Sequence, residues 1–295
     1  IQPDGDCYKQ VELKYHLKGR QRRKTESEEN EHGINYHDDT TICPSDIPQK
    51  YWMEAYDPER RRIETLPKGF IVLRNFLSRK EQLDFAYRIV VELSNSPHTN
   101  LTNLYGRQPD LWDEACSSND FTKFDKLRWI SLGYRYDWTE RQYIHDDITP
   151  FPDDISNLAR NAGSTAQYPG WDEFVSEAGI VNFYALKSSM GGHVDDAEID
   201  GSKPVISFSL GCACIFLMGG PTRNDPVLPV ILRSGDVAIM GGSARFCYHG
   251  VARIIPDSCP RFSPKEVTKK NEPILQYLQT HRINVNARQV FSSNS

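Results

Sequence analysis

The sequence predicts an α+β fold, in which a double-stranded β-helix, a jelly roll of two facing β-sheets, is flanked by N-terminal helices. The first observation is a series of strand-length apolar runs after residue 180, separated by turn glycines at Gly219, Gly220, Gly235, Gly241 and Gly242. The second is a helical period that ends before those runs begin. With 295 residues, 38% hydrophobic and 25% charged, the chain is long enough for one sizeable core with an attached extension.

Residues 1–65 are expected to form a polar N-terminal extension. A basic block gives way there to an acidic block, with Lys14, Lys18, Arg20, Arg22, Arg23 and Lys24 followed by Glu26, Glu28, Glu29 and Glu31. A solvated arm is one interpretation of such opposite blocks. The other is an arm that contacts phosphates, in which each cationic side chain adds salt-sensitive affinity.

Residues 66–180 are expected to hold helices and loops. An apolar run over residues 69–73 has the length of a strand, and Ser78 with Gln82 resembles a helix start. The helix that follows would bury one apolar stripe, made of Leu83, Phe85, Ala86, Ile89, Val90 and Leu93. A second helix is predicted over residues 153–162, which show the same apolar spacing.

Residues 127–143 crowd aromatic side chains beside arginines. The aromatics are Trp129, Tyr134, Tyr136, Trp138 and Tyr143, and the arginines are Arg128, Arg135 and Arg141. Aromatic faces interleaved with guanidinium groups suit base stacking and phosphate contact. The alternative is a strand whose alternate aromatics fill a core, which we favour for Trp129 and Trp138.

Residues 181–295 are expected to form the jelly-roll core. Strands are predicted over residues 181–184, 205–210, 213–217, 230–232, 236–240 and 283–290. The longest apolar stretch, from Val205 to Met218, is interrupted by polar residues and is too short for a membrane helix, which needs about 20 apolar residues. This stretch predicts buried strand structure, and no membrane partner is expected.

His193 and Asp195 stand two positions apart, so an extended backbone would project both side chains toward the same side. His249 supplies a second imidazole further along the chain. Two histidines and one carboxylate can occupy one face of an octahedral iron, which leaves positions open for a co-substrate and O2. A catalytic zinc takes the same ligand types, so from the triad alone iron and zinc both stay open.

The segment from Arg282 to Arg288 alternates polar and apolar residues, as a strand with one polar face does. Its polar positions are Arg282, Asn284, Asn286 and Arg288. The six-residue step between the two arginines spans roughly 20 Å at about 3.3 Å per residue. Arginines at both ends, folding toward each other, would bracket a small dicarboxylate, since a guanidinium forms charge-assisted bonds with a carboxylate.

Several short motifs occur in one order along the chain. They are Asn182-Phe183-Tyr184, His193-Val194-Asp195, the Pro-Val-Ile-Ser-Phe-Ser-Leu-Gly run of residues 204–211, Gly235-Asp236-Val237, Tyr248-His249-Gly250 and the segment from Arg282 to Arg288. Over residues 66–290 this order resembles the AlkB family of Fe(II)/2-oxoglutarate-dependent dioxygenases. Residues 127–136, 149–152 and 177–180 look most similar to the family's homologue-1 branch of nucleic acid dioxygenases.

The resemblance implies a role for each of these residues. The Fe(II) ligands, which are also the catalytic residues, would be His193, Asp195 and His249. Contacts to 2-oxoglutarate would come from Asn182, Tyr184, Arg282, Asn284 and Arg288. Among them, Arg282 would take the distal carboxylate. Substrate contacts would come from two tyrosines of the nucleotide-recognition lid, within residues 66–180, and from an arginine that matches one of the bacterial members; these are Tyr134, Tyr143 and Arg223.

The activity implied is oxidative demethylation of methylated bases with Fe(II), 2-oxoglutarate and O2, releasing formaldehyde, succinate and CO2. The expected substrates are N6-methyladenine in unpaired DNA and N1-methyladenosine or methylcytosine in tRNA, because a base must be flipped out or already unpaired to reach a buried centre. Bacterial repair members carry an acidic residue two positions beyond the metal aspartate, where this chain has Ala197. That departure weakens the expectation of direct repair of cationic alkylated bases.

Two other classes of function stay open. A protein (histone) lysine demethylase or hydroxylase would use the same metal centre, since the triad and the arginine strand concern only the cofactor chemistry. A noncatalytic nucleic-acid binder is the other class, although a binding module has no need of a complete ligand set.

Charge and cysteine content set further expectations. A net charge of −5 means that nucleic-acid binding must rely on a local basic face. Seven cysteines without a Cys-x-x-Cys pair argue against a disulfide framework or a zinc cluster, and favour a reducing compartment. We expect a monomer in the nucleus, the mitochondrion or the cytoplasm.

Overall fold

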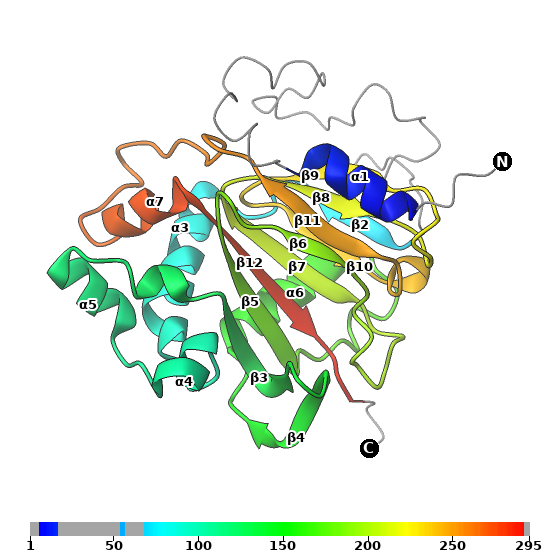
Figure 1. The fold of residues 1–295 in the computed structure, drawn as a ribbon, viewed down its shortest axis with the longest axis horizontal. Coiled ribbons are helices and arrows are strands. Elements are labelled where there is room, and N and C mark those ends of the chain that lie inside the picture. The colour runs from blue at the N-terminus through cyan, green and yellow to red at the C-terminus, as the bar shows by residue number, and fades with distance from the viewer. Residues whose placement is uncertain (1–5, 17–53, 57–67, 292–295) are drawn as a thin grey trace.

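The computed structural model describes residues 6–16, 54–56 and 68–291. Within them two β-sheets face each other (Figure 1). The larger sheet has the strand order β1 (Glu54–Tyr56), β2 (Phe70–Leu73), β10 (Val237–Met240), β7 (Val205–Gly211), β12 (His281–Arg288), β5 (Ala178–Ala185), β3 (Trp129–Asp137), β4 (Gln142–Ile148). The smaller has the order β6 (Met190–His193), β11 (His249–Ile254), β8 (Cys214–Met218), β9 (Leu228–Leu232). Apart from β1 with β2, the paired strands are antiparallel, as a jelly roll requires.

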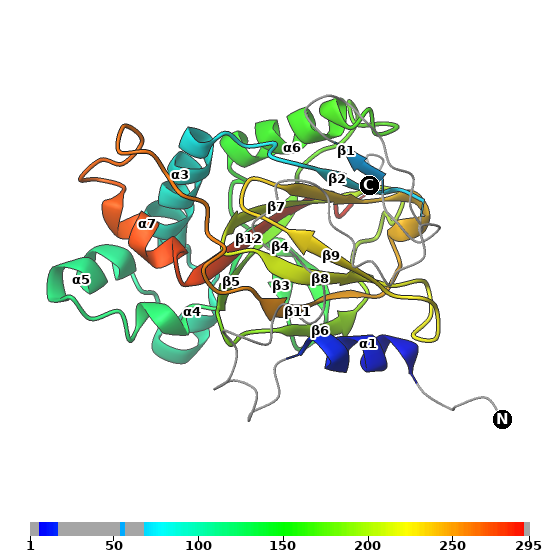
Figure 2. The ribbon, with the colours of Figure 1, turned by 90° about the horizontal axis from the view of Figure 1, so that it is seen from above.

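Helices cover the outer face and one end of the larger sheet (Figure 2). They are α3 (Arg79–Tyr87), α4 (Asn100–Tyr105), α5 (Leu111–Ser118), α6 (Asp153–Thr165) and α7 (Glu272–Leu278). A π-helical turn (Arg88–Glu92) and a 3-10 turn (Leu93–Asn95) extend α3, and two further 3-10 turns span Phe124–Lys126 and Gly242–Ala244. Both helices predicted from apolar spacing are therefore present.

Helix α3 begins after Ser78, as predicted, but the residue that pairs with Ser78 at the helix start is Glu81 and not Gln82. The Ser78 hydroxyl accepts a hydrogen bond from the Glu81 amide, and the Glu81 carboxylate accepts one from the Ser78 amide. This reciprocal pair is a capping box, which satisfies two donors at the helix end. Gln82, which the sequence suggested for that role, is instead buried and donates to the Leu77 carbonyl.

The long apolar stretch from Val205 to Met218 is buried, and it is divided between the two sheets as β7 and β8. The division falls at Gly211, whose φ of 78° lies in the left-handed region that favours glycine. A Cβ there would also meet the His281 carbonyl oxygen at 2.2 Å. The backbone therefore turns at Gly211 and carries the chain from one sheet to the other, which places apolar side chains on both walls of the core.

The N-terminal extension differs from expectation over its first described residues. Helix α1 (Cys7–Tyr15) packs against β6 and β11 of the smaller sheet (Figure 2), and its Tyr8 side chain is fully buried. Residues 6–16 are therefore part of the folded core, which a polar arm would not be. Most of the basic block and the whole acidic block lie outside the described residues, so the structure does not distinguish a solvated arm from a phosphate-contacting one.

Among the described helices, none combines the length and the apolar character that crossing a membrane requires.

Candidate active site

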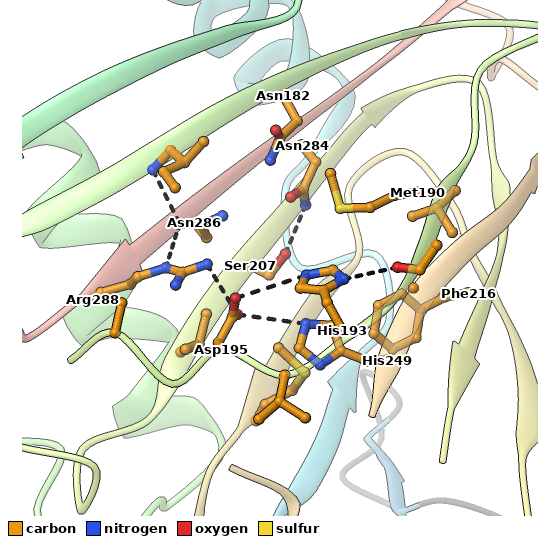
Figure 3. A pocket seen from close by; sticks show the side chains of 18 of the residues that line it. Asn182, Met190, His193, Asp195, Ser207, Phe216, His249, Asn284, Asn286 and Arg288 are labelled. Atoms are coloured by element: carbon orange, nitrogen blue, oxygen red, sulfur yellow. Dashed lines mark hydrogen bonds and ion pairs between the residues drawn. The ribbon is translucent and has the colours of Figure 1, made fainter. Parts of the chain in front are cut away.

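The predicted triad comes together at the paired ends of two strands. His193 ends β6, His249 begins β11, and the two residues are register partners with ring centroids 4.4 Å apart. Asp195 reaches back to both rings, with 3.8 Å from its Oδ1 to His193 Nε2 and 3.5 Å from its Oδ2 to His249 Nε2. One ligand atom from each residue lies within 4.8 Å of the others. The sequence thus predicted three side chains that do converge on one point (Figure 3).

Hydrogen bonds fix which nitrogen of each histidine faces that point. His193 Nδ1 lies 3.0 Å from the Gly191 carbonyl oxygen, and His249 Nδ1 lies 3.1 Å from the Cys247 carbonyl oxygen. A carbonyl only accepts, so each Nδ1 carries the proton and donates. Each Nε2 then has its lone pair free for a metal, which is the usual arrangement of a ligating histidine with a supporting carbonyl.

The charge state of the triad suits a divalent metal. Burial would raise the pKa of the Asp195 carboxyl, but Arg288 and the two histidines outweigh it and hold that pKa well below its ordinary value. Burial, with His249 beside it, lowers the pKa of His193. At neutral pH the aspartate is therefore ionised and the imidazole of His193 is neutral, the forms in which both bind a metal.

Arg288 and Glu198 anchor the metal aspartate from behind. Arg288 donates from Nη2 to Asp195 Oδ2 at 2.9 Å, from Nη1 to Glu198 Oε1 at 2.7 Å, and from Nε to Asn286 Oδ1 at 3.0 Å. Arg288 therefore lies at the end of β12 that is nearer the triad. All three of its guanidinium nitrogens therefore have protein partners, and one of these partners is the carboxylate of the metal aspartate (Figure 3).

A cavity of about 480 Å³ lies beside the triad, between the two sheets. Its polar lining comes mainly from β5 and β12 of the larger sheet, as Asn182, Tyr184, Arg282, Asn284, Asn286 and Arg288. The apolar lining includes Met190 and Phe216, which lie near the histidines (Figure 3). All five residues predicted to contact 2-oxoglutarate therefore line one cavity together with all three predicted metal ligands.

Arg282 is the clearest sign of an anionic ligand in that cavity. Its side chain is 1% exposed, and its Nη2 donates to the Ser209 hydroxyl at 2.9 Å. Its Nε and Nη1 have no hydrogen-bond partner among the described residues. A buried guanidinium left without partners is costly, and a carboxylate in the cavity would supply the missing acceptors. Arg282 therefore has the free donors that Arg288 lacks.

The remaining polar lining residues are held in place by the sheet. The Asn284 amide nitrogen donates to the Ser207 hydroxyl at 2.7 Å and to the Phe208 carbonyl at 3.0 Å. Burial raises the pKa of Tyr184, whose hydroxyl stays protonated and lies 3.6 Å from Met190 Sδ. Tyr184 on β5 and Asn284 on β12 both face the cavity from the larger sheet. For β12 this is the polar face that the period-two alternation predicted.

The donor set and the cavity fit Fe(II) with 2-oxoglutarate. Two imidazoles and one ionised carboxylate on one side would leave coordination positions open for a co-substrate and O2, and the cavity is also lined by the buried guanidinium of Arg282, which has free donors. His193, Asp195 and His249 would hold the metal, and Arg282 would hold one carboxylate of the co-substrate. When bound, the metal and co-substrate supply oxidation by O2, with succinate and CO2 as products.

The lid tyrosines predicted to contact substrate do not line the cavity. Tyr143 is 8% exposed and packs with Ala178 and Val290, so it has no free face on which a base could stack. Tyr134 packs edge-on against Phe291, with 4.7 Å between ring centroids. Neither ring therefore reaches the cavity, and substrate contact by the half-buried Tyr134 and the buried Tyr143 stays a prediction.

Tyr136 and Trp138 take the position that the lid tyrosines were expected to hold. Both line the cavity, and their rings meet edge to face with 4.8 Å between centroids. Trp138 is 45% exposed, so the expectation that it fills a core is wrong. The strand β3 ends at Asp137, and the turn beyond it carries Trp138 to the mouth of the cavity.

Arg223 is also placed differently from its predicted role. Its Nε donates to the Asp6 carboxylate at 2.5 Å, and its guanidinium carbon lies 5.5 Å and 5.3 Å from the ring centroids of Tyr8 and Tyr248. It does not line the cavity. In this structure Arg223 joins the N-terminal helix to the smaller sheet.

Sequence reasoning also missed Arg245, which supports the metal aspartate. Arg245, 2% exposed, donates from Nη1 to the Asp195 main-chain carbonyl at 2.5 Å and from Nη2 to the Glu198 carboxylate at 2.6 Å. It follows the 3-10 turn Gly242–Ala244, and no periodic pattern surrounds it. The only hint in the sequence was an acidic residue close to the metal aspartate, which needs a cation if it is buried.

Comparison with known proteins gives the same class as the geometry. Residues 69–288 match the family model described as the 2OG-Fe(II) oxygenase superfamily. The chain belongs to this superfamily, so it is an Fe(II)/2-oxoglutarate-dependent dioxygenase, and the zinc alternative is set aside. Fe(II), 2-oxoglutarate and O2 were the predicted cofactors, and that prediction is confirmed, as are the double-stranded β-helix and the enzyme class.

Individual relatives narrow the family. The chain is 34% identical over 264 residues to the DNA N(6)-methyladenine demethylase ALKBH1A of Arabidopsis thaliana, across 76% of this chain and 75% of that protein. It is 30% identical over 274 residues to the tRNA demethylase abh1 of Schizosaccharomyces pombe, across 84% and 88%. The solved structure of OsALKBH1 matches with a TM-score of 0.55 at 25% identity, covering 77% of this chain and 99% of that one. Within the superfamily the chain is a member of the AlkB family, in the homologue-1 branch.

Proposed function

We propose that the protein removes N-methyl groups from bases of DNA or tRNA, with release of formaldehyde. The single observation that carries the proposal is the cavity itself. It joins the triad, the unsatisfied guanidinium of Arg282 and a partly exposed aromatic pair, Tyr136 and Trp138. The relatives named as demethylases of DNA and tRNA support a nucleic-acid substrate.

The preferred substrate is an unpaired base. A net charge of −5 gives no general grip on a duplex, so recognition rests on local contacts. An aromatic face at the cavity mouth can stack on a base only when the base has left its own stack, which costs a few kcal/mol in a duplex. Bubbles, bulges and tRNA loops avoid that cost.

Trp138→Ala should therefore reduce the advantage of an unpaired substrate. A stacked base contributes roughly 1–3 kcal/mol, so single-turnover demethylation of a bubble oligonucleotide should slow by at least about fivefold. Trp171→Ala is the matched control, since Trp171 is 37% exposed and does not line the cavity. Equal slowing in both variants, or no slowing in Trp138→Ala, would remove the stacking role.

The charges around the substrate side favour a neutral base over a cationic one. Ala197 lines the cavity where an acidic side chain would meet a cation. Asp196 is paired with Arg141, with 3.2 Å between Oδ1 and Nη2, and Glu198 is fully buried against Arg245 and Arg288. We propose that N6-methyladenine, which is neutral, is a better substrate than 1-methyladenine, which carries a positive charge.

Ala197→Asp tests that preference directly. A carboxylate about 7 Å from a cation contributes on the order of 2 kcal/mol at an effective dielectric constant of about 20. The ratio of rates for 1-methyladenine over N6-methyladenine in the same bubble oligonucleotide should rise by at least about tenfold. Ala197→Asn, which is similar in size and uncharged, is the control. An unchanged ratio in the Asp variant would mean that charge at this position does not select the base.

Mass spectrometry of nucleosides tests the substrate class. The protein, supplied with Fe(II) and 2-oxoglutarate, is incubated with methylated DNA, methylated tRNA and methylated lysine peptides in parallel. We expect loss of methyl groups from the nucleic acids, and none from the peptides. Loss from the peptides alone would support the protein demethylase alternative, and no methyl loss from any of the three would mean that the tested methyl groups are not the substrate.

We further propose that the protein works as a monomer in a reducing compartment, the nucleus, the mitochondrion or the cytoplasm. The six cysteines among the described residues are free thiols, which supports a reducing environment. DNA and tRNA occur in these compartments, which supports the same choice.

A further inference from the structure

Helix α1 holds the two strands that carry the metal histidines. Its Tyr8 ring is fully buried where three glycines meet, Gly192, Gly219 and Gly250. A Cβ added at these positions would come within 2.3 Å, 3.1 Å and 3.0 Å of Tyr8 atoms, respectively. A side chain at Gly192 would therefore clash with the ring, and side chains at Gly219 and Gly250 would crowd Tyr8.

Two of these glycines are direct neighbours of metal ligands. Gly192 precedes His193 at the end of β6, and Gly250 follows His249 at the start of β11. Tyr8 thus lies close to the backbone beside both histidines. It packs with Ile215 and Leu217, whereas Phe216 between them lines the cavity, so Tyr8 lies on the opposite face of the smaller sheet. A shift of its ring would be transmitted to both ligands.

Strand β6 needs such support. It has four residues, Met190–His193, two of them glycines, and it forms the edge of the smaller sheet. It pairs with β11 only at two positions, with a register shift between them. Glycines lose more conformational entropy on ordering than other residues, so a short glycine-rich edge strand is weakly held by itself.

Further contacts fasten α1 over this edge strand. The Tyr8 amide donates to the Arg223 carbonyl at 2.8 Å, and Arg223 in turn binds the Asp6 carboxylate and the Gly192 carbonyl. At the other end of the helix, His16 Nε2 lies 3.2 Å from the Ser189 hydroxyl, just before β6. Hydrogen bonds therefore connect α1 to both ends of strand β6, through Arg223 at Gly192 and through His16 at Ser189.

We propose that Tyr8 is a positioning residue for the metal centre, which acts through the backbone of Gly192 and Gly250 on His193 and His249. This inference rests on the proposed metal-dependent function, and it assigns to the N-terminal segment a role in metal affinity. Groups that support metal ligands from behind typically contribute about 10- to 100-fold to metal affinity.

The test measures Mn(II) binding to the metal-free full chain, without substrate, from the loss of the free-ion EPR signal. Mn(II) accepts the same oxygen and nitrogen ligands as Fe(II). Tyr8→Ala should weaken Mn(II) binding by at least about tenfold. Tyr8→Phe should keep the affinity of the unchanged protein, because the ring remains and the hydroxyl contact with the Leu217 carbonyl is long, at 3.4 Å.

Tyr15→Ala is the matched control, since Tyr15 is also buried on α1 but is not among the nearest neighbours of the Cβ positions of the three glycines, where Tyr8 is. It should lower the unfolding temperature and leave Mn(II) affinity in place. Unchanged Mn(II) affinity in Tyr8→Ala, with a comparable loss of stability, would overturn the proposal. If Tyr8→Ala does not fold, Arg223→Met decides: it removes the ties to Asp6 and Gly192, and unchanged affinity there also overturns the proposal.

The outcome is separable from the proposed function. A protein that binds Mn(II) but demethylates no base would refute the demethylase proposal, and the affinities of the Tyr8 variants would still decide the role of α1.

Discussion

His193→Ala is expected to abolish 2-oxoglutarate turnover and leave the fold intact. The imidazole is one of three metal ligands, and losing a ligand costs more than the about 10- to 100-fold that losing a supporting group costs. The side chain is 36% exposed, and within the described part of the chain it hydrogen-bonds to the Gly191 carbonyl, so the core does not depend on it. Succinate formation is the measurement, with the circular dichroism spectrum as the check on folding.

His145→Ala is the matched control for this prediction. His145 lies on β4, its side chain is 75% exposed, and it does not line the cavity. The same chemical change there should leave turnover close to that of the unchanged protein. Turnover in His193→Ala equal to that of the control would contradict the assignment of the metal centre.

Arg282→Leu is expected to raise the 2-oxoglutarate requirement far more than the oligonucleotide requirement. Truncating one partner of a buried charge pair costs about 2–5 kcal/mol, which corresponds to binding of 2-oxoglutarate that is weaker by at least about 30-fold. Without 2-oxoglutarate the variant should be no less stable, because it loses a buried guanidinium with two unsatisfied nitrogens. Thermal unfolding with and without 2-oxoglutarate measures both effects, since a ligand that binds the folded state raises the unfolding temperature.

Arg282→Lys refines the same experiment. It keeps the charge and loses the planar fork that matches a carboxylate, so its 2-oxoglutarate affinity should lie between those of the unchanged protein and Arg282→Leu. A fall in nucleic-acid affinity alone, with an unchanged 2-oxoglutarate response, would mean that this strand contacts phosphates and that the co-substrate lies elsewhere.

The cofactor half of the site could be predicted from the sequence because strand geometry is local. Side chains two apart in a strand share a face, so Arg282, Asn284 and Arg288 had to point into one space once β12 formed. His193 and Asp195 also meet, but Asp195 lies two residues beyond the end of β6, so the strand rule alone does not account for their contact. Pairing with His249 depends on a distant strand, and there the order of family motifs supplied what periodicity could not.

The substrate half could not be predicted in the same way. The hairpin of β3 and β4 has a register shift between Tyr134 and Arg135, which local alternation does not reveal. Tyr136 and Tyr143 are cross-strand partners, yet only Tyr136 reaches the cavity, because β5 and the C-terminal residues bury Tyr143. Which aromatic is exposed is decided by tertiary packing.

The burial of Tyr8 was hidden for a related reason. The residues that receive its ring, Gly192, Gly219 and Gly250, lie far from it in the sequence, and each looks like an ordinary turn or strand glycine. The polar composition of residues 1–65 pointed to an extension because composition averages over the segment. One short helix with a single well-placed aromatic residue is enough to change that interpretation.

Whether the cavity couples cofactor oxidation to base demethylation is tested most directly by the ratio of formaldehyde to succinate. This ratio is measured in single turnovers on a bubble oligonucleotide with one N6-methyladenine. If the cavity couples the cofactor to an unpaired methylated base, the two products should appear together, one for one, and the unmethylated bubble should give little of either. Succinate at the same rate from both oligonucleotides, with no formaldehyde from either, would contradict the account, because the centre would then turn over without acting on the base.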